Sequence, residues 1–209
     1  MSNVSNWRKL TIDIGNVFLS PLILHFRVKK LYADNVSPEE IKALKGALIA
    51  ANHVGFSDPL ILNSIFWNRR FFYTASEEVM TGFKGRLLNA AGCIKLDRTT
   101  ADFEGIKRCA AVLKDGSLLG LFPQGHIDGD GAKGGMVLIA AMAKVPIVPT
   151  YIGKRKRFWL RHKVVFGKPV NIADYTQKFL PGKNEIDMIL EEYDRRMEAC
   201  RDILQKQCD

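Results

Sequence analysis

The sequence predicts an α/β fold: a mixed, largely parallel sheet flanked by helices. Two observations support this prediction. Short, nearly continuous apolar runs recur from residue 47 onward, which is typical of strands that are buried on both faces. Segments with helical patterning separate the runs, and strands that alternate with helices are typical of parallel sheets. The expected strands are 47–51, 71–75, 93–96, 117–122, 146–152 and 163–167.

The segments between these runs carry helix signals. Asp58 followed by Pro59 suits the N-cap and the first position of a helix, and Gly92 stands where a helix is expected to end. The expected helices are 59–68, 77–90, 101–114, 134–143 and the long amphipathic 184–206. Open sheets of this class bind ligands at the carboxyl ends of their strands. Residues that directly follow the strands are therefore the first candidates for a functional site.

The composition fits one globular domain and points to an anionic partner. Of the 209 residues, 47% are hydrophobic and 25% are charged, the ordinary range for globular proteins. The 31 Lys and Arg exceed the 22 acidic residues, giving a formal charge of +9. This excess favours nucleic acid, an acidic membrane face, a phosphorylated substrate or an acidic protein, without choosing among them. The four cysteines lack zinc-site spacing and no signal peptide is recognised, so we expect a cytoplasmic protein with reduced thiols.

The N-terminal segment, residues 1–33, is expected to be helical, membrane-associating and separate from the α/β domain of residues 34–209. Its apolar stretch, 7–28, is interrupted too often for a clean membrane-spanning helix. The interruptions are Asp13, Asn16, Pro21 and His25. Trp7 and Phe26 lie next to basic residues, as interfacial anchors do. The segment is interpreted either as a pair of helices packed on the domain's core or as a helix lying in the membrane surface, and the two are compatible.

Polar residues follow three of the expected strands. Asn52 and His53 come after the first strand, Asp97 and Arg98 come after the third, and the sequence PQGH, 123–126, comes after the fourth. The carboxyl ends of parallel strands lie at one edge of a sheet, so these three segments are expected to meet there.

His53 and Asp58 are candidates for a catalytic pair. On one continuous helix their side chains would point about 140° apart. They can meet if His53 lies at the strand exit, Asp58 begins the next helix and the chain folds back at Gly55. Asp58 would then hold one ring nitrogen while the other takes a proton from a hydroxyl. The alternatives are a helix-capping Asp58 with a structural His53, or Ser57 as a nucleophile, although no GxSxG elbow surrounds Ser57.

Four blocks of residues occur in order along the chain, across roughly residues 45–155. They are Asn52, His53 and Asp58; Gly92, Ile94, Asp97 and Arg98; Phe122, Pro123 and Gly125; and Val145 to Pro149. These residues match the patterns NHxxxxD (the HX4D motif), GxIxxDR, part of FPEGTR, and VPIVP. Their order and spacing resemble the glycerolipid acyltransferases, the family typified by 1-acylglycerol-3-phosphate (lysophosphatidic acid) acyltransferase.

This resemblance implies a reaction and a set of roles. A fatty acyl group would pass from a thioester, acyl-CoA or acyl carrier protein, to a hydroxyl of a lysophospholipid. The most direct acceptor is 1-acylglycerol-3-phosphate, which would give phosphatidic acid. His53 would be the general base, oriented by Asp58, and the guanidinium of Arg98 would bind the acceptor's phosphate. The implied chemistry needs no covalent acyl-enzyme and no cofactor, and no metal site is expected.

The third block departs from the family pattern. Gln124 replaces glutamate, His126 replaces threonine and Ile127 replaces arginine. The first change removes the carboxylate that would hold acceptor oxygens, and the last removes a second guanidinium fork for the phosphate. Gln124, Gly125 and His126 remain candidates for binding the acceptor, and Lys133 is a candidate to replace part of the lost charge. The departure leaves the acceptor open: a different lyso-lipid, or an acceptor without phosphate, also fits.

A basic stretch, 153–163, includes Phe158 and Trp159 among its lysines and arginines. Such a stretch fits a nucleic-acid surface, a membrane surface or a solvated hairpin between two strands. With the acyltransferase blocks present, we favour an anionic membrane surface or docking of a carrier protein, and no nucleic acid is expected. We therefore expect a cytoplasmic enzyme that is peripheral on the inner face of the cell membrane. The rival is a non-catalytic lipid- or nucleic-acid-binding domain on the same scaffold.

Overall fold

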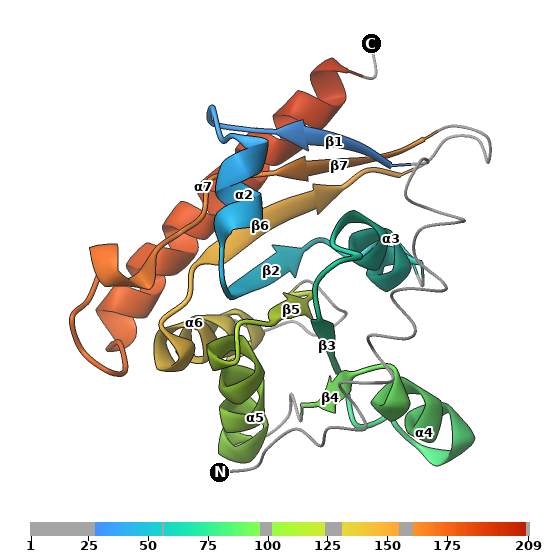
Figure 1. Ribbon diagram of the computed structural model, residues 1–209. Helices are drawn as coiled ribbons and strands as arrows, with labels where there is room; N and C mark the ends of the chain where they lie inside the picture. The colour runs from blue at the N-terminus through green and yellow to red at the C-terminus, as the bar shows by residue number, and fades with distance from the viewer. Residues whose placement is uncertain (1–27, 56, 97–101, 124–130, 155–160, 208–209) are drawn as a thin grey trace.

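A computed structural model describes residues 28–55, 57–96, 102–123, 131–154 and 161–207. Its centre is a seven-stranded sheet with the strand order β1-β7-β6-β2-β5-β3-β4 (Figure 1). The strands are β1 (Val28–Tyr32), β2 (Ala47–Ala51), β3 (Phe71–Ala75), β4 (Cys93–Lys95), β5 (Leu118–Leu121), β6 (Ile147–Ile152) and β7 (His162–Phe166). Strands β6, β2, β5, β3 and β4 run parallel, β7 is antiparallel to β6, and β1 is parallel to β7. The predicted mixed, largely parallel sheet is confirmed.

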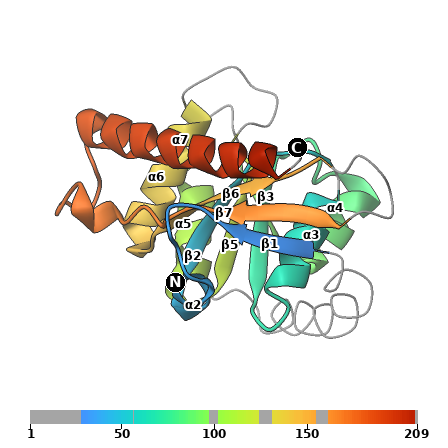
Figure 2. The same ribbon diagram turned by 90° about the horizontal axis from the view of Figure 1, so that it is seen from above.

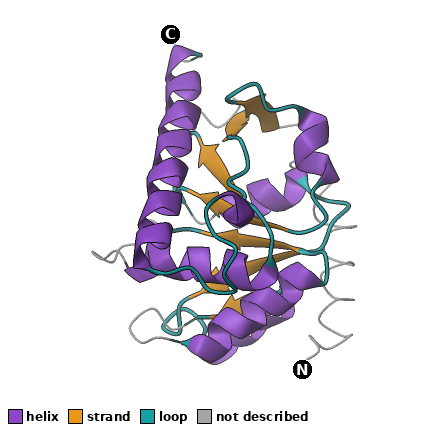
Figure 3. Cartoon of the chain, turned by 90° about the vertical axis from the view of Figure 1, so that its left-hand side faces the viewer, coloured by secondary structure: helices purple, strands orange, loops and turns teal. Residues whose placement is uncertain are grey.

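Helices cover both faces of this sheet. They are α2 (Pro38–Ala43), α3 (Asp58–Ile65), α4 (Gly82–Ala90), α5 (Phe103–Lys114), α6 (Gly131–Ala143), α7 (Lys183–Lys206) and the short 3-10 helix η2 (Ile172–Asp174). Seen from above, α7 lies along one face while α2 and α3 lie on the other (Figure 2). The view from the side shows helices on both sides of the strands (Figure 3). None of the helices within the described ranges is both long enough and apolar enough to cross a membrane.

The apolar run of β2 is continuous because this central strand is buried on both faces of the sheet. All five of its residues are buried, and alternate side chains enter different cores. Leu48 and Ala50 pack in the core that α5, α6 and α7 cover. Ala47, Ile49 and Ala51 pack in the core on the side of α3. Because a strand buried on both faces needs apolar side chains throughout, β2 has no polar residue until its carboxyl end.

Two elements in the structure are not predicted by the apolar runs. β1 reads VKKLY and is an edge strand, which is only partly buried and tolerates its two lysines. α2 has only six residues, and Ser37 caps it by accepting a hydrogen bond from the backbone N–H of Glu40. A short element of either kind leaves little periodicity for a sequence pattern to reveal.

Strand β1 also changes the expected domain boundary. It pairs in full with β7, and the backbone N–H of Ala33 donates to the Phe166 carbonyl at 2.8 Å. Residues 28–33 therefore belong to the sheet, whereas the expected N-terminal helical segment extends to residue 33. The rest of that segment, 1–27, lies outside the described residues.

Candidate active site

The carboxyl end of β2 and the beginning of α3 bring His53 and Asp58 together (Figure 1). Asn52 and His53 leave the sheet directly after β2, and Asp58 is the first residue of α3. Between them the chain turns back, with the backbone N–H of Asp58 donating to the Gly55 carbonyl at 3.1 Å. The Nδ1 atom of His53 consequently lies 2.7 Å from Oδ2 of Asp58. The folded-back turn that the five-residue spacing requires is present.

One oxygen of Asp58 collects three hydrogen bonds. Besides the His53 ring, Oδ2 accepts from the backbone N–H groups of Val54 at 2.7 Å and Gly55 at 2.9 Å. Asp58 is not the N-cap expected from the sequence, because Ser57 occupies that position and makes no side-chain cap bond. The carboxylate turns back to the preceding loop instead of forward to the helix. Asp58 thus fixes the loop that carries His53, and it is almost fully buried, at 1% exposed.

These contacts decide which ring nitrogen of His53 carries the proton. An oxygen that accepts from two backbone N–H groups has no proton of its own to offer the ring. Nδ1 must therefore be the donor to Asp58, which leaves the lone pair of Nε2 available. The His53 side chain is 44% exposed, so Nε2 belongs to a ring that an outside molecule can reach. The arrangement suits a base whose proton acceptor faces a substrate.

Phe122 holds the His53 ring from a second direction. It follows β5 directly, and its ring stacks on the imidazole with centroids 4.8 Å apart and planes 28° apart. Behind it lies Tyr73, whose ring is nearly parallel to that of Phe122 at 6.5 Å. The Tyr73 hydroxyl donates to the Pro59 carbonyl at 2.7 Å, which links the stack back to α3. Burial raises the pKa of Tyr73 well above its usual value, so this hydroxyl stays protonated.

Asn52 fixes the point from which His53 leaves the sheet. Its Nδ2 donates to the Ile152 carbonyl at 3.0 Å, and its Oδ1 accepts from the Ile152 backbone N–H at 2.6 Å. The parallel ladder between β2 and β6 ends at Ala51 and Thr150. The buried Asn52 amide therefore acts as one more rung of that ladder. Sequence reasoning noted Asn52 as part of a motif but missed this role, and it missed the contact of Phe122 with His53. The signal available was the position of each residue directly after a strand.

The remaining site candidates belong to segments that leave the same edge of the sheet. β5 pairs in parallel with β2 and with β3, and β4 pairs in parallel with β3. The carboxyl ends of β2, β4 and β5 therefore face the same way. Arg98 follows β4, while Gln124, Gly125 and His126 follow β5; all four lie outside the described residues. Lys133 belongs to α6, but its side chain also lies outside what the structure describes. The structure therefore brings together His53 and Asp58 among the predicted residues.

The cysteines within the described residues are poor candidates for a covalent nucleophile. Cys93, Cys109 and Cys200 are buried and form no disulfide, and Cys208 lies outside the described residues. Burial raises the pKa of the Cys109 thiol to about 12 and that of Cys200 to about 12, so neither forms a thiolate near neutral pH. Within the described part of the chain, the exposed imidazole of His53 remains the group best suited to accept a proton from a substrate.

Comparisons with known proteins identify the family of this chain. A model of the acyltransferase family matches residues 34–153, which is more than half of the chain and includes His53 and Asp58. The 1-acyl-sn-glycerol-3-phosphate acyltransferase of Bacillus subtilis is 29% identical over 167 residues, covering 76% of this chain and 83% of that protein. The protein of the same name from Streptococcus pneumoniae is 34% identical over 135 residues, covering 61% of this chain and 51% of the relative.

A solved structure shares the fold. The crystal structure of the 1-acyl-sn-glycerophosphate (LPA) acyltransferase from Thermotoga maritima matches with a TM-score of 0.57 and 18% sequence identity. The match covers 95% of this chain and 83% of that chain. The chain therefore belongs to the acyltransferase family, in which the 1-acyl-sn-glycerol-3-phosphate O-acyltransferases are found.

Proposed function

We propose that the protein transfers a fatty acyl group from an acyl thioester to the hydroxyl of 1-acylglycerol-3-phosphate, giving phosphatidic acid. The observation that carries this proposal is the pairing of His53 with Asp58 at 2.7 Å, at the carboxyl edge of the sheet and inside the segment that the family model matches. Both relatives named above are 1-acyl-sn-glycerol-3-phosphate acyltransferases, which supports this choice of acceptor.

His53 is the general base of the proposed reaction. Its Nε2 takes the proton from the acceptor hydroxyl as the hydroxyl oxygen attacks the thioester carbonyl. The new ester forms when the carbon–sulfur bond breaks, and the thiolate of the donor recovers the proton from the imidazolium. Asp58 stabilises that imidazolium through Nδ1, and a base held in this way contributes about 10²- to 10⁴-fold in rate. Acyl-CoA or an acylated carrier protein supplies the acyl group, and no covalent acyl-enzyme, metal or cofactor is needed.

The acceptor's phosphate is assigned to basic residues of the later blocks. By the family pattern, Arg98 binds the phosphate through its guanidinium fork, and Lys133 adds charge. Gln124, Gly125 and His126 line the acceptor's polar end in this proposal. Because Gln124 takes the place of the family's glutamate and a second arginine is missing, a lyso-lipid with another head group is the second candidate acceptor.

We also propose that the enzyme works peripherally on an anionic membrane surface, the inner face of the cell membrane. Among the described residues, four large apolar side chains are exposed in the loops and first helical turns after β2, β3 and β4, on the same edge as His53. They are Leu60 at 50%, Val79 at 49%, Phe83 at 81% and Phe103 at 48% exposed. Apolar side chains at this edge and a formal charge of +9 both suit contact with an anionic leaflet. The lysophospholipid would then reach His53 from the membrane.

An acceptor panel tests the proposed function. Purified protein is incubated with labelled acyl-CoA or acylated carrier protein, and with 1-acylglycerol-3-phosphate, other lysophospholipids or monoacylglycerol. Product with 1-acylglycerol-3-phosphate supports the first proposal, and product only with another acceptor supports the second. Binding of lysophospholipid without turnover of any donor would overturn both and favour a non-catalytic lipid-binding domain.

A further inference from the structure

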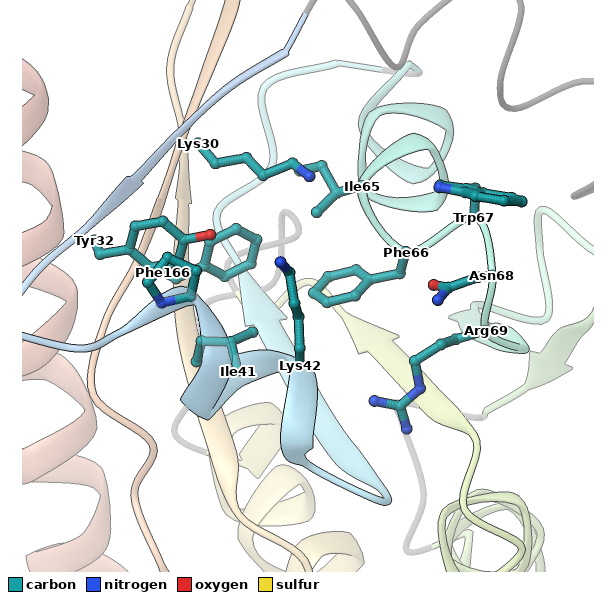
Figure 4. Close-up of a pocket in the computed structure, with 11 residues that line it drawn as sticks. Lys30, Tyr32, Ile41, Lys42, Ile65, Phe66, Trp67, Asn68, Arg69 and Phe166 are labelled. Carbon is teal, nitrogen blue, oxygen red and sulfur yellow. The ribbon is translucent and has the colours of Figure 1, made fainter.

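A cavity of about 340 Å³ lies between β1, β7, α2 and the end of α3 (Figure 4). A few hundred cubic ångströms is the size of a site for a small molecule rather than for a single ion. Apolar groups make up about half of its wall, with Ile41, Ile65, Phe66 and Phe166 contributing side chains. Tyr32 extends this wall, since its ring stacks on Phe166 with centroids 5.9 Å apart.

Two lysines extend into this cavity, the half-buried Lys30 and the exposed Lys42. Lys30 comes from β1 and Lys42 comes from α2, and Figure 4 shows their side chains reaching into the same space from different sides. Burial, followed by the charge of Lys42, lowers the pKa of Lys30. Within the described ranges, neither ammonium has a hydrogen bond or an ion pair, and no acidic residue lines the cavity. Two like charges beside apolar side chains, with no acidic residue in the cavity wall itself, favour an anionic ligand.

Two further polar side chains at the cavity, Arg69 and Tyr32, have defined roles. Arg69 turns its guanidinium to the backbone, donating to the carbonyls of Leu44, Lys45 and Gly116, so its charge adds to the positive potential from a fixed position. Burial, followed by the charge of Glu39, raises the pKa of Tyr32. The Tyr32 hydroxyl therefore remains protonated and can donate a hydrogen bond to an anion.

The cavity is separate from the candidate active site. Helix α3 begins at Asp58, beside His53, and ends at Ile65, which lines the cavity. The eight residues of α3 span about 12 Å, so the two sites lie at opposite ends of one helix. Acyl transfer at His53 makes no use of Lys30 or Lys42.

We propose that this cavity binds an amphiphilic anion, with its carboxylate or phosphate head between Lys30 and Lys42 and its apolar chain against Ile65, Phe66 and Phe166. The head relieves the repulsion between the two ammonium groups and accepts hydrogen bonds from both. The chain displaces water from the aromatic walls, which contributes the apolar share of the binding free energy. Fatty carboxylates and single-chain phospholipids both have this chemistry.

Calorimetric titration of the full-length protein tests the site without any acyl transfer. Three probes separate the contribution of the charged head to binding from that of the apolar chain. They are decanoate below its critical micelle concentration, inorganic phosphate, and decan-1-ol. We expect decanoate to bind at least about tenfold more tightly than either of the others, because only decanoate joins a charge to a chain. Phosphate or decanol binding as tightly as decanoate would overturn the assignment, as would no binding of decanoate.

Variants locate the binding event. Lys30→Met and Lys42→Met keep most of the length of each side chain and remove its charge, and each is expected to weaken decanoate binding about tenfold. Lys29→Met is the matched control: Lys29 is the neighbouring residue of β1 and reaches the other way, to Oε1 of Gln207 at 3.1 Å. Lys29→Met and His53→Ala should bind decanoate as the unaltered protein does.

Two outcomes would contradict the assignment. Decanoate affinity that is unchanged in the Lys30→Met, Lys42→Met double variant would place the binding event elsewhere. An equal loss of affinity in Lys29→Met would show that net charge alone is responsible. Removing two like charges is not expected to unfold the protein, and thermal melting checks this. Since no donor or acceptor is present, the result does not depend on the proposed acyl transfer.

Discussion

Replacing Asp58 by asparagine separates the charge of this carboxylate from its hydrogen bonds. One of its two oxygens, Oδ2, accepts three hydrogen bonds. They come from the His53 ring at 2.7 Å and from the backbone N–H groups of Val54 at 2.7 Å and Gly55 at 2.9 Å. The carbonyl oxygen of an asparagine can take the same place and accept the same three hydrogen bonds. Asp58→Asn should therefore keep the turn and the tautomer of His53 and remove the negative charge alone.

The lost charge sets the size of the effect. Two unit charges about 4 Å apart near a protein surface attract each other by about 4 kcal/mol. Because the His53 side chain is 44% exposed, solvent weakens this attraction, and we expect about 3 kcal/mol to remain for stabilising the imidazolium. A difference of about 1.4 kcal/mol is tenfold in rate, so kcat should fall about a hundredfold.

The assay combines steady-state acyl transfer with urea denaturation. The free energy of unfolding of Asp58→Asn should fall by less than about 1 kcal/mol, because the three hydrogen bonds are kept. Asp58→Ala, the matched control, should lose about 1–3 kcal/mol because the N–H groups of Val54 and Gly55 lose their acceptor. A kcat for Asp58→Asn equal to that of the unaltered enzyme would refute the role of the charge. A stability loss as large as that of Asp58→Ala would refute the separation of charge from hydrogen bonding.

Three further predictions concern stability and acceptor choice. Asn52→Ala should lower the unfolding free energy in urea by about 1–3 kcal/mol, because the backbone N–H of Ile152 loses its partner; an unchanged value would show that the amide is not a rung of the sheet. Hydrogen bonds from Arg195, and then from Arg196, hold the pKa of Glu192 at about 2. The stability that this carboxylate contributes is therefore full above its unfolded pKa of about 4.3 and lost as the pH falls towards about 2. Glu192→Gln should flatten that part of the stability curve, and an identical acid transition would count against the prediction. Gln124→Glu should raise the rate with 1-acylglycerol-3-phosphate if the amide limits use of a phosphate-bearing acceptor, and no change in kcat/KM would indicate a site rebuilt around glutamine.

The interior of the sheet follows closely from the sequence. The apolar runs 47–51 and 71–75 coincide with β2 and β3, because strands buried on both faces leave a continuous apolar signal. Strand β1 leaves no such signal, since an edge strand with lysines resembles any partly exposed segment. Its pairing with β7 joins residues that are far apart in the chain, and nothing local in VKKLY indicates that partner.

The candidate site is predictable in its members and less so in its contacts. The spacing of His53 and Asp58, with Gly55 between them, indicates a turn that brings the side chains together. The direction of the carboxylate is not encoded in that spacing: a residue before Pro59 fits a helix cap equally well, and only the folded loop shows that Oδ2 faces backwards. The lysine-lined cavity depends on four elements meeting, so no single stretch of sequence reveals it.

The most direct test of the central claim is the rate of acyl transfer by His53→Ala, measured with a saturating acyl thioester and 1-acylglycerol-3-phosphate. The ring of His53 is partly exposed and makes one hydrogen bond to the described residues, that to Asp58, so its removal should leave the thermal melting of the protein nearly unchanged. If Nε2 is the base, kcat should fall about 10²- to 10⁴-fold in this folded variant. A folded His53→Ala protein that retains the full rate would contradict the account.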